Sequence, residues 1–424
     1  MTRPDPQALL RRLFDEAFAV ADPMQVIPKA LPPRPEGRVF VLGAGKASAR
    51  MAEAVEAAWG PCDGLVITRY GYGRETAGIE IVEAAHPVPD RAGAEATARM
   101  LDLAQGLGPG DTALILISGG GSALLTAPAG DITLAEKQQV NAALLRSGAP
   151  IDKMNVVRKH LSRVKGGQLA AAAFPATVLC LMISDVPGDN PADIASGPTV
   201  GEASSPDDAL EVLRHFRVDV PPRVLEHLSK GSGVVAPSAM ALSTTANRIV
   251  AAPSHSLNAA AEIARRHGMD VRILGDALEG EARQLAQEQA RLALALQLEM
   301  GPGDAPIVLL SGGECTVSGR GTGIGGPNAE FALALMCALQ GARGIHALAC
   351  DTDGVDGAAE VAGARVSPDS LRRAASLGLD PGEALAAHDS HTYFAAVRDQ
   401  IVTGPTLTNV NDFRALLIQP ADKE

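Results

Sequence analysis

The sequence contains few aromatic side chains. They make up 3% of the 424 residues, whereas 46% of the residues are hydrophobic, so Ala, Gly, Leu and Val must supply most of any core. Small aliphatic side chains suit closely packed layers of helices on sheets. The composition therefore predicts a globular chain rather than a disordered one.

Cysteine, positive charge and long apolar runs are also scarce. The five cysteines are odd in number and form no C-x-x-C pair, which argues against a disulfide framework and a structural zinc site. A net charge of -12 argues against a nucleic-acid surface. No segment approaches the roughly 18 apolar residues of a membrane span, and the N-terminus does not resemble a signal peptide. We therefore expect a cytoplasmic protein with small-molecule ligands and no nucleic-acid or membrane partner.

The length and the order of apolar segments predict two domains. A single core stops growing at about 250 to 300 residues, and this chain is longer. A helix is predicted over residues 7–20, and from Arg38 apolar strands alternate with helices. We expect an α/β fold with a doubly wound, mainly parallel sheet in residues 1–236, a smaller α/β domain in residues 237–424, and the active site in the cleft between them.

Ligands of open α/β sheets bind beyond the carboxyl ends of the strands, so the loops that follow apolar runs are the candidate sites. Four such loops are rich in glycine or polar residues. They are GAGKAS from Gly43, SGGGSA from Ser118, SDVPGDN from Ser184 and DTDGVDG from Asp351.

The GAGKAS loop predicts an anion site. The chain turns through Gly43 and Gly45 into a helix N-terminus, which favours phosphate or carboxylate, and Lys46 adds a charge. A dinucleotide fingerprint would need Gly or Ala at Ser48 and an acidic residue near Thr68, and a Walker loop would need Gly at Phe40. A plain strand-to-helix turn with a solvated lysine is the alternative.

The SGGGSA loop predicts a second phosphate site. Its backbone amides could wrap an anion in a concave nest, and three ordered glycines in a row are costly without such a role. The alternative is a tight turn; a nucleophile elbow is excluded because Leu124 stands where it needs glycine. The candidate residues are Ser118, Gly119, Gly120, Gly121 and Ser122.

The SDVPGDN loop follows a strand apolar enough to be buried. One of its carboxylates could accept the proton of a substrate hydroxyl, although the same residues also suit an ordinary turn. The candidates are Ser184, Asp185, Asp189 and Asn190.

The DTDGVDG loop predicts a magnesium site. Asp351 and Asp353 follow an apolar strand, and carboxylates there could hold Mg²⁺ that also contacts phosphate oxygens. Clustered acids, Asp356 included, repel one another unless they share a cation.

Other charged residues fit no recognisable pattern. The basic run with Arg158, Lys159, Arg163 and Lys165 could bind anionic groups or form a solvated face. The histidines His86, His255, His388 and His391 have no triad or metal spacing, so we interpret them as structural.

Taken in order, these motifs resemble the glycerate 2-kinase family, whose C-terminal part is called the MOFRL domain. The resemblance covers almost the whole chain and implies a Rossmann-like N-terminal domain. The motifs that carry it are GAGKAS, ISGGGSALL, NVVRKHLSRVKGGQLA, LMISDVPGDNPADIASGPT, LLSGGECTV, GGPNAEFALAL, DTDGVDG and GPTLTNVND.

The resemblance implies a transferase that uses ATP and magnesium to convert D-glycerate to 2-phosphoglycerate. It implies that Lys46 binds phosphate and that Glu314 belongs to the substrate site. We assign Asp189 as the base and Asp351 and Asp353 to the metal, in a monomer or homodimer.

The chain departs from the family pattern at Pro327, where many members have an arginine, and Arg320 is the candidate substitute. Some members carry the older label of hydroxypyruvate reductase. An NAD(P)H-dependent reductase, disfavoured by the failed dinucleotide fingerprint, and a noncatalytic sugar-acid sensor remain the alternatives.

Overall fold

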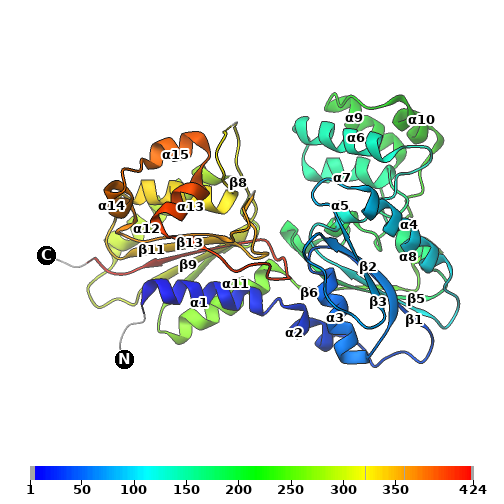
Figure 1. Ribbon diagram of the computed structural model, residues 1–424, viewed down its shortest axis with the longest axis horizontal. Coiled ribbons are helices and arrows are strands. Elements are labelled where there is room, and N and C mark those ends of the chain that lie inside the picture. Colours follow the sequence, from blue (N-terminus) through cyan, green and yellow to red (C-terminus); the bar gives the residue numbers. More distant parts are fainter. Residues whose placement is uncertain (1–4, 320, 358, 422–424) are drawn as a thin grey trace. The chain divides into compact units, whose positions relative to one another are not determined.

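The chain divides into two compact units, which Figure 1 shows with their elements labelled. The structure, a computed structural model, describes residues 5–319, 321–357 and 359–421. Pro23–Ala251 forms one unit, called here the parallel-sheet unit. Met1–Asp22 joins Ala252–Glu424 in the other, called here the mixed-sheet unit.

The parallel-sheet unit contains a six-stranded sheet in the order β3-β2-β1-β4-β5-β6. Every neighbouring pair of its strands is parallel, as expected for a doubly wound α/β domain. The central strand β4 is buried at all six positions, which explains its unbroken apolar sequence. The strands are β1 (Val39–Ala44), β2 (Asp63–Arg69), β3 (Ile79–Ala84), β4 (Thr112–Ile117), β5 (Thr177–Ile183) and β6 (Thr245–Ala251).

The helices of this unit form two groups. In one, α4, α5 and α8 share a core with the sheet, against which α3 also packs; the other, α6, α7, α9 and α10, has a hydrophobic core of its own around Val140, Val157 and Val212. The helices are α2 (Pro23–Ala30), α3 (Ser48–Trp59), α4 (Arg91–Gln105), α5 (Gly121–Leu124), α6 (Leu134–Arg146), α7 (Ile151–His160), α8 (Gln168–Ala173), α9 (Pro206–His215) and α10 (Pro222–Lys230), with 3-10 turns η1 (Pro187–Asp189), η2 (Ile194–Ser196) and η3 (Met240–Leu242).

The mixed-sheet unit contains a second six-stranded sheet, in the order β13-β12-β11-β14-β9-β7. Only the β7–β9 pair in this sheet is parallel, among the residues described. Its strands are β7 (Asp270–Gly275), β9 (Ile307–Gly313), β11 (Ile345–Asp351), β12 (Gly363–Val366), β13 (Gln400–Ile401) and β14 (Asp412–Ile418), and a separate two-stranded sheet pairs β8 (Gly280–Glu281) with β10 (Cys315–Thr316).

Alternation along the strands gives this second sheet two buried faces. Val308 and Leu310 of β9 pack into a core with α1 and α11, whereas Ile307 and Leu309 pack into a core with α12 and α13. The unit therefore has three layers, which Figure 1 shows as helices on both faces of the sheet. Its helices are α1 (Pro6–Ala19), α11 (Pro253–Arg266), α12 (Ala282–Glu299), α13 (Pro327–Leu339), α14 (Ser370–Ser376), α15 (Pro381–Ala387) and α16 (Ser390–Val397).

The division between the units differs from the predicted boundary at residue 236. Strand β6 pairs in parallel with β5, so the first sheet ends at Ala251. The first helix also belongs to the mixed-sheet unit, because Leu10, Leu13 and Phe14 are buried against α11 and that unit's sheet. The α/β class and the presence of two domains are confirmed. Within the described residues, no helix is long and apolar enough to cross a membrane.

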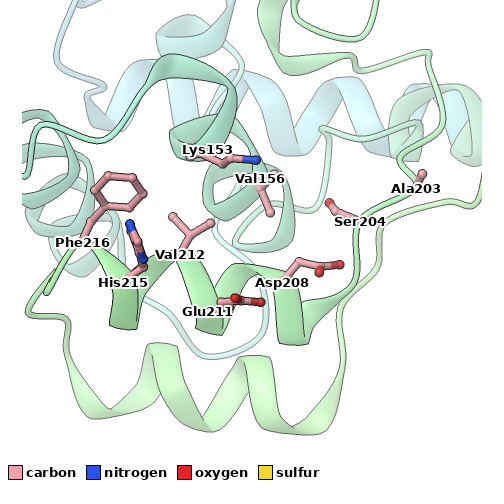
Figure 2. Close-up of a pocket in the computed structure, with 9 residues that line it drawn as sticks. All are labelled: Lys153, Val156, Ala203, Ser204, Asp208, Glu211, Val212, His215 and Phe216. Carbon is pink, nitrogen blue, oxygen red and sulfur yellow. The ribbon is translucent and has the colours of Figure 1, made fainter.

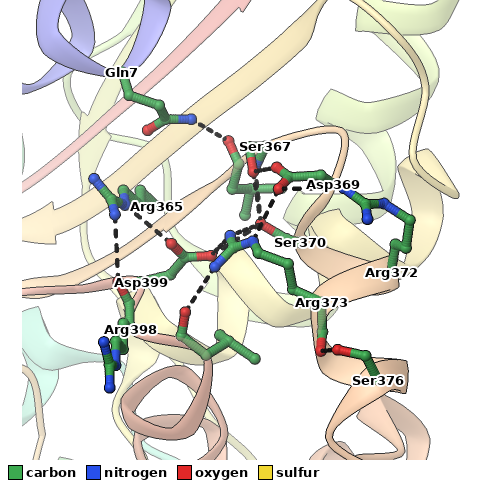
Figure 3. A network of polar contacts seen from close by, with 12 residues as sticks. Gln7, Arg365, Ser367, Asp369, Ser370, Arg372, Arg373, Ser376, Arg398 and Asp399 are labelled. Atoms are coloured by element: carbon green, nitrogen blue, oxygen red, sulfur yellow. Dashed lines mark hydrogen bonds and ion pairs between the residues drawn. The ribbon is translucent and has the colours of Figure 1, made fainter.

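A buried carboxylate at Asp399 organises one edge of the mixed sheet (Figure 3). Its Oδ1 accepts a hydrogen bond from Arg365 Nε at 3.0 Å, and its Oδ2 accepts from Ser370 Oγ at 3.0 Å and from Arg373. Gln7 of α1 donates to the carbonyl of Val366 at 2.8 Å, which joins α1 to the same edge. Because both carboxylate oxygens of Asp399 accept from protein donors, we interpret this network as structural.

Candidate active site

The two glycine loops follow β1 and β4, which are neighbours at the centre of the parallel sheet. Strand order runs outward from this pair in both directions, so the β1–β4 junction is the topological switch point. Ligands of doubly wound sheets bind in the crevice at the carboxyl ends of such a pair. The sheet topology thus brings Gly43–Ser48 and Ser118–Ser122 to the position where a ligand is expected.

The first loop can exist only because two of its residues lack a side chain. A Cβ on Gly43 would lie 2.2 Å from the carbonyl oxygen of Leu116. A Cβ on Gly45, whose φ is +147°, would lie 2.1 Å from Ser118 Oγ. The loops are also joined by a hydrogen bond of 2.8 Å from Lys46 N to the carbonyl of Gly119. The glycines therefore allow the two loops to approach each other closely.

The side chain of Ser118 connects the two loops by hydrogen bonds. Its side chain is fully buried, and its Oγ accepts a hydrogen bond of 3.0 Å from Ala47 N and lies 3.2 Å from Ser48 Oγ. The Ser118 hydroxyl is thus used within the protein rather than presented to a ligand. The first turn of α3, which begins at Ser48, carries no acidic residue, so the turn itself does not neutralise the positive end of the helix dipole.

Gly120 is the meeting point of three chain segments. Its φ of +77° is left-handed, and a Cβ there would lie 3.2 Å from Lys46 Cγ and 3.0 Å from His86 Nε2. Lys46 follows β1, His86 lies just after β3, and Gly120 follows β4. The side chains of Lys46 and His86 therefore lie together over the second glycine loop. From the sequence His86 was predicted to be structural; its position directly after a strand was the available signal.

A buried lysine, Lys165, donates a hydrogen bond to the second glycine loop. Lys165 is 1% exposed and its Nζ donates to the carbonyls of Ser122 at 2.9 Å and Ala195 at 3.4 Å. Burial, reinforced by nearby positive charges, lowers the pKa of Lys165 well below its ordinary value. Ser122 Oγ and Ser196 Oγ lie 2.7 Å apart.

The chain opposite this loop is strained. Ala195 and Ser196 have φ values of +52° and +61°, which residues with a side chain rarely adopt. Such conformations persist only where the surrounding structure enforces them, and they cluster at functional sites. The contacts of Lys165 and Ser122 supply that enforcement.

The candidate residues of the SDVPGDN loop differ in burial and in hydrogen bonding. Ser184 is fully buried, and its hydroxyl accepts a hydrogen bond from Val186 N at 3.3 Å in a local turn. Asn190 is exposed and bonds to Ala192 N and to Asp193. Asp185 is half-buried.

Asp189 differs from the other residues of this loop. Its φ of +53° is left-handed, and its Oδ1 is buried with no hydrogen-bond partner among the described residues. A buried carboxylate oxygen normally has a partner, because its desolvation is otherwise not offset. The unpartnered oxygen and the left-handed backbone are the features that make Asp189 a candidate site residue in this loop.

The candidates of the mixed-sheet unit lie in two loops, one after β9 and one at the end of β11. Glu314 is exposed after β9, Asp351 ends β11, and Asp353 is fully buried. Asp351 Oδ1 accepts from Asp353 N at 2.9 Å, and Asp353 Oδ1 accepts from Val355 N at 2.8 Å. Both carboxylates thus hold the turn, and Arg320 lies outside the described residues.

Asp356, the third aspartate of this motif, is bound by another part of the unit. Its carboxylate accepts hydrogen bonds from Asn328 N at 2.9 Å and Ala329 N at 2.8 Å, at the N-terminus of α13. His391 Nε2 lies 3.0 Å from its Oδ2. The Asp356 carboxylate is therefore engaged by the N-terminus of α13 and contacted by His391, which differs from the expectation that all three acids share one cation.

Two carboxylates still suit magnesium. No group of three metal-ligating side chains occurs in the part of the chain that the structure describes. Mg²⁺, however, is commonly bound through one or two carboxylates together with substrate phosphates. The hard oxygen donors of Asp351 and Asp353 fit that mode.

A separate groove of about 580 Å³ lies between α7 and α9 (Figure 2). It contains none of the predicted site residues. Its lining combines Lys153 with the acidic Asp208 and Glu211 and the rings of His215 and Phe216. Because Asp208 is the N3 residue of a capping box at the start of α9, we assign its carboxylate a structural role.

Two families match the chain, described as "Domain of unknown function (DUF4147)" over residues 9–229 and "MOFRL family" over residues 307–412. A protein of Agrobacterium vitis, named provisionally as a hydroxypyruvate reductase, is 52% identical over 97% of this chain and 94% of its own length. The D-glycerate 2-kinase of Thermotoga maritima is 35% identical over 96% of this chain and 98% of its own.

A solved structure agrees with these similarities. The crystal structure of glycerate kinase from Thermotoga maritima matches with a TM-score of 0.86 at 34% identity, over 98% of this chain and 100% of that one.

Proposed function

The chain belongs to the glycerate 2-kinase family with a C-terminal MOFRL domain, and on this premise we propose that it transfers the γ-phosphoryl group of ATP to the 2-hydroxyl of D-glycerate. The products are 2-phosphoglycerate and ADP. The observation that carries the proposal is the convergence of Lys46 and two glycine loops at the switch point of the parallel sheet.

The phosphate chain of ATP is held by the two glycine loops. Close packing of Gly43 and Gly45 against β4 and Ser118 brings the backbone of both loops to the same crevice. We assign the amides of Gly119 and Gly120 to phosphate oxygens, since the Gly121 amide already donates to the carbonyl of Ser118 at 3.2 Å. The N-terminus of α3 adds its dipole. Lys46 supplies the positive charge that stabilises the phosphoryl group during transfer.

Asp189 accepts the proton of the attacking hydroxyl. The 2-oxygen of glycerate forms a bond to the γ-phosphorus, the bond from that phosphorus to the bridging oxygen breaks, and ADP leaves with its electrons. Oδ1 of Asp189 is buried without a partner in the described residues, so it can receive the proton. Asp185, Asn190 and Glu314 are the remaining polar residues assigned to the hydroxy acid.

Asp351 and Asp353 would hold magnesium. Bound there with phosphate oxygens, Mg²⁺ would neutralise charge on the transferred group. The turn that these two residues form keeps both carboxylates ordered after β11.

The second candidate function is hydroxypyruvate reduction, which the names of two Agrobacterium vitis relatives suggest. The first glycine loop disfavours it. A dinucleotide site needs an acidic residue after the second strand for the ribose, whereas here Thr68 is buried and donates to the carbonyl of Gly45 at 3.1 Å. That position therefore supports the glycine loop and offers no carboxylate to a nucleotide ribose.

One preparation of the purified protein tests both functions. It is incubated with D-glycerate, ATP and Mg²⁺, ADP release is followed, and the product is identified by phosphorus NMR; NADH and hydroxypyruvate are supplied in a parallel reaction. We expect Mg²⁺-dependent formation of 2-phosphoglycerate. Lys46→Ala should lower kcat at least about 100-fold, the cost of removing one transition-state donor.

Lys230→Ala is the matched control, because Lys230 is an exposed lysine of the same unit, paired with Glu226. It should leave kcat unchanged. NADH oxidation without ADP release would overturn the kinase proposal in favour of the reductase. Binding of glycerate without turnover in either reaction would indicate a sensor.

A further inference from the structure

His86 occupies a position that nothing in its immediate sequence explains. It follows β3, which is separated from β1 by β2 in the sheet, yet its ring lies over Gly120 of the loop after β4. A Cβ built on Gly120 would lie 3.0 Å from His86 Nε2 and 3.1 Å from Cδ2. The edge of the ring that carries Nε2 therefore faces the glycine loop.

Gly120 leaves room for two side chains that can donate hydrogen bonds. Lys46 Cγ would lie 3.2 Å from the same built Cβ, so the lysine stem and the imidazole share the space above this glycine. An apolar ring would fill that space equally well. An imidazole adds a donor that is strong when its acceptor is anionic.

We propose that His86 is a phosphate-binding residue, whose Nε2 donates a hydrogen bond to a phosphoryl oxygen of the nucleotide held by Lys46 and the Ser118–Ser122 loop. This inference rests on the proposed function for the identity of its ligand. The phosphate site would then be formed by residues that follow three strands, β1, β3 and β4. It also gives Gly120 a second role, since any side chain there would displace both donors.

Two substitutions of His86 distinguish hydrogen-bond donation by the ring from its packing on Gly120. His86→Phe keeps an aromatic ring over Gly120 and removes the donor, whereas His86→Gln removes the ring and keeps an N–H donor. Binding of ATP and of inorganic tripolyphosphate is measured by calorimetry, without turnover. His86→Phe should weaken both ligands by the same factor, roughly 10- to 100-fold, the value of a hydrogen bond to a charged group. His86→Gln should stay within about threefold of the unchanged protein.

His227→Phe is the matched control. His227 also packs on a left-handed glycine of the same unit, with Nδ1 3.0 Å from a Cβ built on Gly130, and its Nε2 lies 3.1 Å from the carbonyl oxygen of His160 rather than over the Ser118–Ser122 loop. Its substitution should leave both affinities unchanged. If His86→Phe does not fold, His86→Ala carries the same expectation, with thermal unfolding measured alongside.

The outcomes keep the two proposals apart. Tripolyphosphate binding that depends on His86, in a protein that does not phosphorylate glycerate, would support His86 and reject the kinase. Glycerate phosphorylation with unchanged affinities in His86→Phe would reject His86 and keep the kinase. Equal losses in the Phe and Gln variants would show that the ring only packs. Absence of binding in the unchanged protein would reject both proposals.

Discussion

Three lysines of the parallel-sheet unit are buried, which the sequence does not indicate. Lys137, Lys159 and Lys165 are each no more than 5% exposed. Lys159 pairs with Glu202 at 2.6 Å, whereas Lys137 donates to the carbonyl of Leu161 and Lys165 to that of Ser122. The basic run was predicted to bind anions or to form a solvated face. For Lys159 and Lys165 the solvated face is wrong, because both lie inside the protein.

Lys137→Met should change how stability depends on pH. Burial, with the positive charge of Arg158, lowers the pKa of Lys137 to about 7. Above that pH the unfolded chain binds the extra proton and the folded chain does not, so the free energy of unfolding rises with pH by about 1.4 kcal/mol per unit until the unfolded pKa near 10.4. Between about pH 7.5 and 9, the unchanged protein should gain roughly 2 kcal/mol over the variant.

Urea unfolding of both proteins at the two pH values measures this difference. Lys230→Met serves as the exposed control and should show the same pH dependence as the unchanged protein. Parallel pH profiles for Lys137→Met and the unchanged protein would mean that Lys137 keeps its charge when folded.

At the scale of elements, α13 shows how a loop and a helix distant in sequence depend on each other. Its N-cap residue, Gly326, has no side chain to accept a hydrogen bond. Asp356 takes over this function and accepts from Asn328 N and Ala329 N. A Cβ on Gly326 would lie 2.4 Å from the Asp356 carboxyl carbon. Position 326 must therefore be glycine, because any side chain there would collide with the carboxylate of Asp356, thirty positions later in the chain.

Asp356→Ala should destabilise the mixed-sheet unit by about 2 to 4 kcal/mol, because it removes a buried cap and leaves two helix N–H groups and His391 without their acceptor. Asp380→Ala is the comparison. Asp380 caps α15 in the same way but is exposed, and its loss should cost about 1 kcal/mol. Chemical denaturation measures both values, and equal costs would show that burial adds nothing to the cap.

The elements were more predictable than the contacts between them. Apolar runs ending in glycine or aspartate identified β1, β4, β5 and β11 and the loops that follow them, because each signal is local. The partners of Asp356 and Ser118 could not be predicted, since they depend on strand order and on helices far along the chain. For the same reason, the hydroxyls of Ser118 and Ser184 could not be recognised as internal.

At the scale of the whole molecule, the chain's first helix belongs with its last strand. Leu10, Leu13 and Phe14 of α1 lie in one core with Phe413 of β14, and the rings of Phe14 and Phe413 are 5.8 Å apart. The predicted boundary at residue 236 placed this helix in the N-terminal domain. Amphipathic spacing shows that a helix has a buried face, but it does not show which sheet covers that face.

Phe14→Ala should therefore loosen the mixed-sheet unit. Phe14 is fully buried, and its truncation should cost about 3 to 5 kcal/mol. Because α1 packs on α11 and the mixed sheet, native-state hydrogen exchange should show reduced protection in α11, β9 and β14, with β1 and β4 unchanged. Met51→Ala, at an equally buried position of α3, should give the reverse pattern. Loss of protection in β1 and β4 on truncating Phe14 would assign α1 to the parallel sheet, as the boundary at residue 236 predicted, and would contradict a mixed-sheet unit built from both ends of the chain.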